Sequence, residues 1–153
     1  MLEWRGRARI NATLFFAVLT LLMFSFAVGP EHKLLEKTAG GFLWLAMLLA
    51  SVMSLMESMR LESENDALEG LRLLPLDPLA LFLGKAIVNT LYLFVLAIVL
   101  LPVAVALYGA ELKLGFASMS LVMFLGAAGI SAPGTLYAAI AVQAKARDVL
   151  LPL

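Results

Sequence analysis

The chain has 153 residues, of which 63% are hydrophobic and only 14% are charged, against about 25% charged in ordinary soluble domains. Its eleven basic residues balance its eleven acidic ones, so no net field draws it to nucleic acid, and a nucleic-acid partner is not expected. It has no cysteine, which excludes disulfides, thiolate metal sites and thiol catalysis. This composition predicts an integral membrane protein whose surroundings are the lipid bilayer.

Four apolar runs are long enough to cross a membrane, because about 20 helical residues span its hydrocarbon core. They lie at about residues 10–29, 39–59, 79–108 and 115–142. Residues 30–38 predict a polar link between the first two runs, and residues 148–153 begin another apolar segment. We therefore expect an all-α polytopic bundle, a single domain over residues 1–153, with four complete spans and the start of a fifth.

Between the second and third runs, residues 60–78 form a polar stretch with seven charged side chains. At roughly 3 kcal/mol each at the centre of a membrane helix, these charges keep the stretch in water. Its apolar and acidic residues fall on opposite faces, which predicts a short amphipathic helix. The residues assigned to it are Asp66, Ala67, Leu68, Glu69, Gly70, Leu71 and Leu74. Helices that rest on lipid prefer Lys and Arg, so the acidic face favours docking to a partner protein over lying on the membrane surface.

The third run follows Asp77-Pro78, a pair that is typical of a helix start. At 1.5 Å per residue the run measures about 45 Å, which exceeds the membrane core, so the end near Lys85 is expected to project into the cytoplasm. Tyr108 at the far end is expected to mark the membrane interface. Asn89 and Thr90 are the most polar pair inside a span, and such pairs more often bond a neighbouring helix than a substrate.

The fourth run is rich in small residues, and four of them recur at every fourth position. They are Ala127, Ser131, Thr135 and Ala139. Such a stripe lets another helix approach closely, so we interpret it as a helix-packing face. Gly129, Pro133 and Gly134 interrupt the same run, which leaves two readings open. One is a kink or hinge, and the other is static close packing.

Basic residues set the expected orientation, because they accumulate on the cytoplasmic side. With the N-terminus inside, the inner side holds Arg5, Arg7, Arg9, Arg60, Arg72, Lys85, Lys145 and Arg147, and the outer side holds Lys33, Lys37 and Lys113. The bias of eight to three favours a cytoplasmic N-terminus. It also places the polar stretch in the cytoplasm.

Catalytic motifs are missing from the sequence. A phosphate-binding loop needs the pattern G-x-x-x-x-G-K-[ST], and Gly84-Lys85 comes nearest but lacks the first glycine and the hydroxyl residue. No metalloprotease or serine-hydrolase pattern occurs, so we assign no catalytic residue and no metal site. His32 is the single histidine. It is a weak candidate for a haem ligand on the outer side, and a solvated loop histidine beside Glu31 and Lys33 is the simpler account.

Several segments together resemble the CcmB family, the permease subunit of the cytochrome c maturation ABC transporter, or haem exporter protein B. They are FSFAVGPE at residues 24–31, GGFLWLAMLLASVMSL at 40–55, LESENDALEGLRLLPLDPLALFLGKA at 61–86 and PGTLYAAIAVQAKARDVLLPL at 133–153. The family has six spans in about 220 residues, so this chain resembles the first four and the opening of the fifth. The resemblance implies a type-two ABC exporter fold, in which residues 60–78 couple to a cytoplasmic ABC ATPase.

The resemblance further implies the inner membrane of a bacterium, other membrane subunits of the maturation complex, and haem as the substrate exported or delivered to a periplasmic chaperone. ATP would be hydrolysed by the partner subunit and not by this chain. Two alternatives remain open at this stage. The chain could be the permease of another type-two exporter, or a structural subunit that anchors an ATPase without a translocation path.

Overall fold

The computed structural model describes residues 2–64, 78–111 and 115–150. The helices in these ranges are α1 (Leu2–Val28), α2 (His32–Glu64), α4 (Pro78–Tyr108) and α5 (Phe116–Leu150). Each contains a stretch long and apolar enough to cross a membrane. The predictions of an all-α fold and of four spans are therefore confirmed.

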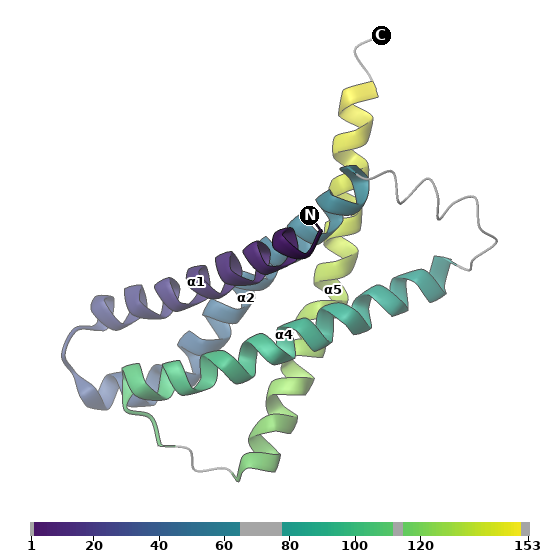
Figure 1. The fold of residues 1–153 in the computed structure, drawn as a ribbon. Coiled ribbons are helices and arrows are strands. Elements are labelled where there is room, and N and C mark those ends of the chain that lie inside the picture. The colour runs from purple at the N-terminus through teal and green to yellow at the C-terminus, as the bar shows by residue number, and fades with distance from the viewer. Residues whose placement is uncertain (1, 65–77, 112–114, 151–153) are drawn as a thin grey trace.

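The α1–α2 and α4–α5 connections lie at one end of the bundle, which we call the outer end (Figure 1). α2 is the central helix. Of the apolar 18-residue stretch that could cross the membrane, 44% is buried inside the protein in α2, against 22% to 28% in the other three helices. α2 and α4 each contact the other three helices, whereas the described parts of α1 and α5 do not touch each other. α5 crosses the other helices steeply and packs mainly on α4 (Figure 1).

Glycines terminate two helices at the outer end. Gly29 follows α1 with a φ of 77°, and Gly109 follows α4 with a φ of 63°. Glycine adopts this left-handed conformation without steric cost, which makes it the usual residue just past a helix end. The Gly29 N–H donates to the Ser25 carbonyl at 3.2 Å, and the Gly109 N–H donates to the Val105 carbonyl at 2.9 Å. These caps allow the sharp turns that return the chain into the bundle.

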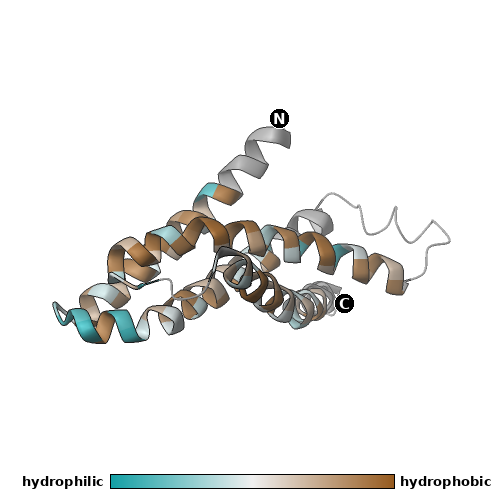
Figure 2. Cartoon of the chain, turned by 90° about the horizontal axis from the view of Figure 1, so that it is seen from below, coloured by the Kyte–Doolittle hydropathy of each residue, from teal (hydrophilic) through white to brown (hydrophobic). Residues whose placement is uncertain are grey.

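The predicted polar link at residues 30–38 is largely wrong, because α2 already begins at His32. The carbonyl of Glu31 accepts the N–H groups of Leu34 and Leu35 and so closes the first turn. Leu35 and Ala39 are buried one turn apart, while the charged residues of the segment face outward. Figure 2 shows this hydrophilic start of α2 at the left of an otherwise hydrophobic bundle. The segment is thus an amphipathic first turn of the second span.

The inner ends of the helices also differ from the expected boundaries. α5 continues through Leu150, so residues 148–150 extend the fourth span's helix and do not begin a separate segment. Residues 143–150 contain no proline or glycine, and therefore nothing in them breaks the helix. α2 likewise runs beyond the predicted residue 59 to Glu64. α4 begins at Pro78, as the Asp77-Pro78 pair predicted.

Candidate functional site

The predicted coupling segment, Asp66 to Leu74, lies outside the described residues. The structure does define both of its flanks, because α2 ends at Glu64 on one side and α4 begins at Pro78 on the other. In the chain, the segment therefore lies between the ends of two long helices. One of them, α2, is the centre of the bundle.

The most polar interior region lies where α4 crosses α5. The side-chain amide of Asn89 donates from Nδ2 to Thr135 Oγ1 at 2.9 Å, and Asn89 is 8% exposed. Ser131 Oγ donates to the Ala86 carbonyl at 2.9 Å. Thr90 instead donates to that same carbonyl within its own helix, at 2.7 Å. Asn89 thus bonds a neighbouring helix, whereas Thr90 bonds its own backbone.

Two members of the small-residue stripe of α5, Ser131 and Thr135, lie at this crossing. Ala127, Ser131 and Thr135 are at most 1% exposed, and Ala139 is half-buried beside Ala138. Small side chains bring the two helix backbones close, which is why a serine hydroxyl of α5 reaches a backbone carbonyl of α4. The hydroxyls therefore leave few polar groups facing lipid at this depth. Chemically, the region joins helices through neutral hydrogen bonds.

Two glycines of α5 receive large side chains from α2. A Cβ at Gly126 would overlap the indole ring of Trp44, and a Cβ at Gly134 would overlap the side-chain end of Leu55. These glycines stand one position before Ala127 and Thr135, so they have the spacing of the stripe but lie in a neighbouring row of the helix. α5 consequently contacts α4 through Ser131 and Thr135 and receives α2 side chains at Gly126 and Gly134.

An aromatic cluster joins three helices near the outer end. The rings of Phe24 and Phe42 stack with centroids 4.9 Å apart, and the ring of Tyr108 lies 5.8 Å from that of Phe42. Tyr108 donates its hydroxyl proton to the Leu21 carbonyl at 2.7 Å and is only 1% exposed. Tyr108 therefore faces neither lipid nor water, and its expected place at the membrane interface stays a prediction. It ties α4 to α1 inside the bundle.

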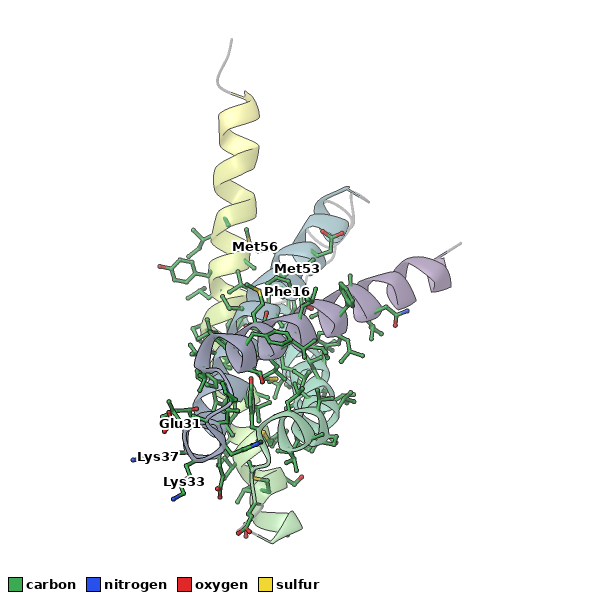
Figure 3. The ribbon with its side chains drawn as sticks, turned by 90° about the vertical axis from the view of Figure 1, so that its left-hand side faces the viewer. Phe16, Glu31, Lys33, Lys37, Met53 and Met56 are labelled. Atoms are coloured by element: carbon green, nitrogen blue, oxygen red, sulfur yellow. The ribbon has the colours of Figure 1, made fainter. Side chains whose placement is uncertain are left out.

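His32 lies on the exposed outer surface, at the first residue of α2. Glu31, Lys33 and Lys37 are exposed beside it, and Figure 3 shows these three side chains pointing away from the helices at one end of the molecule. Within the described ranges, no cluster of three or more His, Asp or Glu side chains could hold a metal ion. The imidazole, between Glu31 and Lys33 in the chain, is open to solvent, and the described side chains do not enclose it.

The whole chain, residues 1–153, matches the family described as CcmB protein. The heme exporter protein B of Haemophilus influenzae is 31% identical over 150 residues, which cover 97% of this chain and 67% of that protein. The Pseudomonas aeruginosa protein of the same name is 32% identical over 153 residues, covering 99% of this chain and 68% of the relative.

The heme exporter protein B of Escherichia coli K12 is 35% identical over 86 residues, which cover 56% of this chain and only 39% of that protein. No solved structure matches the chain significantly. The family match extends over every residue, and two of these relatives exceed 30% identity along nearly the whole chain. The chain belongs to the CcmB protein family.

Proposed function

We propose that this chain is the membrane permease subunit of a heme exporter that serves cytochrome c maturation. The observation that carries the proposal is the CcmB match over residues 1–153, together with relatives named heme exporter protein B. Four helices of membrane-spanning length agree with a permease. Haem is here the substrate to be exported or handed to a periplasmic chaperone, and the protein needs no resident cofactor for this role.

ATP hydrolysis belongs, in this proposal, to a separate cytoplasmic ABC ATPase. The sequence supports this division of labour, because it lacks a phosphate-binding loop. The partner would bind the predicted amphipathic helix at Asp66 to Leu74. The apolar residues of this helix recur at i, i+1, i+4 and i+7, which places them on one face that suits a groove: Ala67, Leu68, Leu71 and Leu74. Other membrane subunits of the maturation complex would complete the assembly.

The proposed location is the inner membrane of a bacterium, with the N-terminus in the cytoplasm. The eight-to-three distribution of basic residues supports this orientation. It puts the connection between α2 and α4 on the side where ATP is available. It also puts the exposed surface around His32 and Lys33 on the periplasmic side, where a haem chaperone would act.

Movement would enter through the ends of α2 and α4. These ends flank the proposed docking helix at Glu64 and Pro78. α4 is bonded to α5 through Asn89 and to α1 through Tyr108, so a displacement of its inner end reaches both helices. We treat residues 1–153 as one permease domain on this basis.

Gene deletion and complementation test the proposal. Deletion should abolish c-type cytochromes while other exports continue, and the wild-type gene should restore them. Loss of another exported substrate with normal c-type cytochromes would assign the chain to a different type-two exporter. Normal levels of both would refute an export role.

Leu71→Asp tests the ATPase contact, and Leu73→Asp is a matched control on the opposite side of the same predicted helix. Central apolar anchors carry most interface energy, so Leu71→Asp should cost at least about 2 kcal/mol, or roughly thirtyfold in affinity. Leu73→Asp should retain the ATPase on co-purification. Wild-type co-purification and cytochrome levels with Leu71→Asp would show that this face does not dock.

A further inference from the structure

α5 is one continuous helix, but a proline within its membrane span breaks the ladder of backbone hydrogen bonds. Pro133 lies inside the helix and has no N–H group, so the carbonyl of Gly129, four residues earlier, loses its intrahelical donor. Gly134 follows immediately, and glycine is a poor helix former. Sharp helix kinks arise at such positions, so α5 is weakest here.

Two hydrogen bonds to α4 lie on opposite sides of this break. Ser131, two residues before Pro133, donates to the Ala86 carbonyl at 2.9 Å. Thr135, two residues after Pro133, accepts from Asn89 Nδ2 at 2.9 Å. Ala86 and Asn89 lie three residues apart on a continuous stretch of α4 that contains no proline. α4 is therefore hydrogen-bonded to α5 on both sides of Pro133 and supports the helix there.

The two bonds differ in how they can open. The acceptor for Ser131 is a fixed backbone carbonyl, whereas the Asn89–Thr135 bond joins two side chains. A threonine in a helix can turn its hydroxyl to the carbonyl four residues earlier, here that of Ser131. This donor role does not compete with the bond from Asn89, because a hydroxyl can donate and accept at once. What distinguishes the Asn89–Thr135 bond is that both of its partners are side chains that can change rotamer. The Asn89–Thr135 bond is the more readily exchanged of the two.

We propose that α5 is a jointed helix whose inner half, residues 134–150, pivots at Pro133, and that the Asn89–Thr135 hydrogen bond is the latch that holds the joint closed. α4 starts at Pro78, so movement at its inner end reaches Asn89 along three turns of helix. The use of this joint in transport rests on the proposed function. The joint itself does not, because its parts are all in this chain.

The expected displacement follows from helix geometry. Ile140 lies seven residues beyond Pro133, or about 10 Å along the axis. A kink of about 30° would move it sideways by roughly 5 Å. Leu121 lies in the outer half of α5, twelve residues before the proline, and should stay in place.

Double electron–electron resonance on the full chain in lipid bilayers measures this displacement, and the absence of native cysteine leaves a clean background for spin labels. Phe15→Cys on α1 serves as a common anchor, paired with Ile140→Cys or with Leu121→Cys. All three positions are more than half exposed, at 67%, 56% and 59%, so labels there avoid the core. The described part of α1 does not contact α5, which keeps the labels apart.

Thr135→Val removes the acceptor with little change in shape. It should shift or broaden the Phe15–Ile140 distances by roughly 5 Å and leave the Phe15–Leu121 distances unchanged. Thr135→Ser keeps a hydroxyl and should match the wild type. Pro133→Ala, at an exposed position, should restore narrow Phe15–Ile140 distances in the Thr135→Val background by rebuilding the helix.

Unchanged Phe15–Ile140 distances in Thr135→Val would overturn the latch. Equal shifts in both pairs would show general loosening of α5 and would overturn it too, as would a failure of Pro133→Ala to restore the narrow distribution. The measurement needs neither ATPase nor haem. A negative result here therefore leaves the deletion test of the proposed function unaffected, and the reverse also holds.

Discussion

Replacing Gly126 by alanine should destabilise the bundle, although alanine is the better helix former. A Cβ at residue 126 would overlap the ring of Trp44. Gly129, three residues later in the same helix, has nothing within 4 Å of a Cβ. Gly129→Ala is therefore a matched control that changes the same atoms in open space.

The comparison between Gly126→Ala and Gly129→Ala isolates the free-energy cost of the overlap with Trp44. Each substitution gains about 1 kcal/mol of helix propensity, and this gain cancels between the two variants. Overpacking costs about 1 to 3 kcal/mol and applies to Gly126→Ala, so this variant should be less stable than Gly129→Ala by that amount. Gly134→Ala should fall between them, because its new Cβ meets Leu55 Cδ1, the flexible end of a side chain that can rotate away.

Reversible unfolding in mixed micelles of increasing SDS content measures these free energies. A double-mutant cycle with Trp44→Phe strengthens the test, because phenylalanine lacks the outer edge of the indole ring. Residues in contact typically show coupling of about 0.5 to 3 kcal/mol, so Trp44→Phe should relieve much of the Gly126→Ala penalty. Equal stabilities of Gly126→Ala and Gly129→Ala, or a coupling energy of zero, would refute the contact.

Three further substitutions probe other parts of the bundle. Tyr108→Phe removes the hydroxyl that donates to the Leu21 carbonyl and should cost about 0.6 to 1.7 kcal/mol of unfolding free energy, because that carbonyl keeps its helical donor. Ser131→Leu should lower the yield of folded protein more than Leu→Ala changes at exposed positions of α4, since it forces bulk into the α4–α5 crossing; equal yields would contradict this. An impermeant thiol reagent added to intact spheroplasts should label Lys33→Cys and not Glu69→Cys, and the opposite pattern would invert the proposed topology.

The number of spans was predictable because bilayer thickness constrains it directly. An uninterrupted apolar run of about 20 residues has few structural alternatives to a spanning helix, and all four runs form such helices. The start of α4 at Pro78 was predictable for a local reason, since proline at the first helical position sacrifices no hydrogen bond. Both features depend on neighbours in sequence alone.

The polar segment at the start of α2 was misread because its charges outnumber its apolar residues. Leu35 and Ala39 are enough to bury one row of that helix, while Lys33 and Lys37 remain exposed. The signal was a spacing of four residues, which a count of charges conceals. Hydropathy alone therefore placed the helix start several residues too late.

Contacts between residues far apart in the chain could not be predicted from the sequence. Trp44 meets Gly126 only because α5 crosses α2 at a particular place and angle, and no periodicity within either helix specifies that crossing. The same holds for Tyr108, whose aromatic ring and terminal position suggested the interface. Its burial depends on the carbonyl of Leu21, which lies 87 residues away. The coupling residues Asp66 to Leu74 stay a prediction, because they lie outside the described residues.

α4 is tied to different helices near its two ends, and this arrangement limits how it can move. Tyr108 holds its outer end to α1, and Asn89 holds its inner half to α5. Between these ties its buried face is built of Leu93, Ala97 and other apolar side chains, which can slide because apolar contacts are not directional. A hydrogen bond has one defined partner and geometry, so it breaks or exchanges in a discrete step. A push on α4 at Pro78 would therefore meet the Ser131–Ala86 and Asn89–Thr135 hydrogen bonds before it reached the outer part of the helix. With the proposed joint, the more readily exchanged of the two, Asn89–Thr135, would set the threshold at which α5 follows.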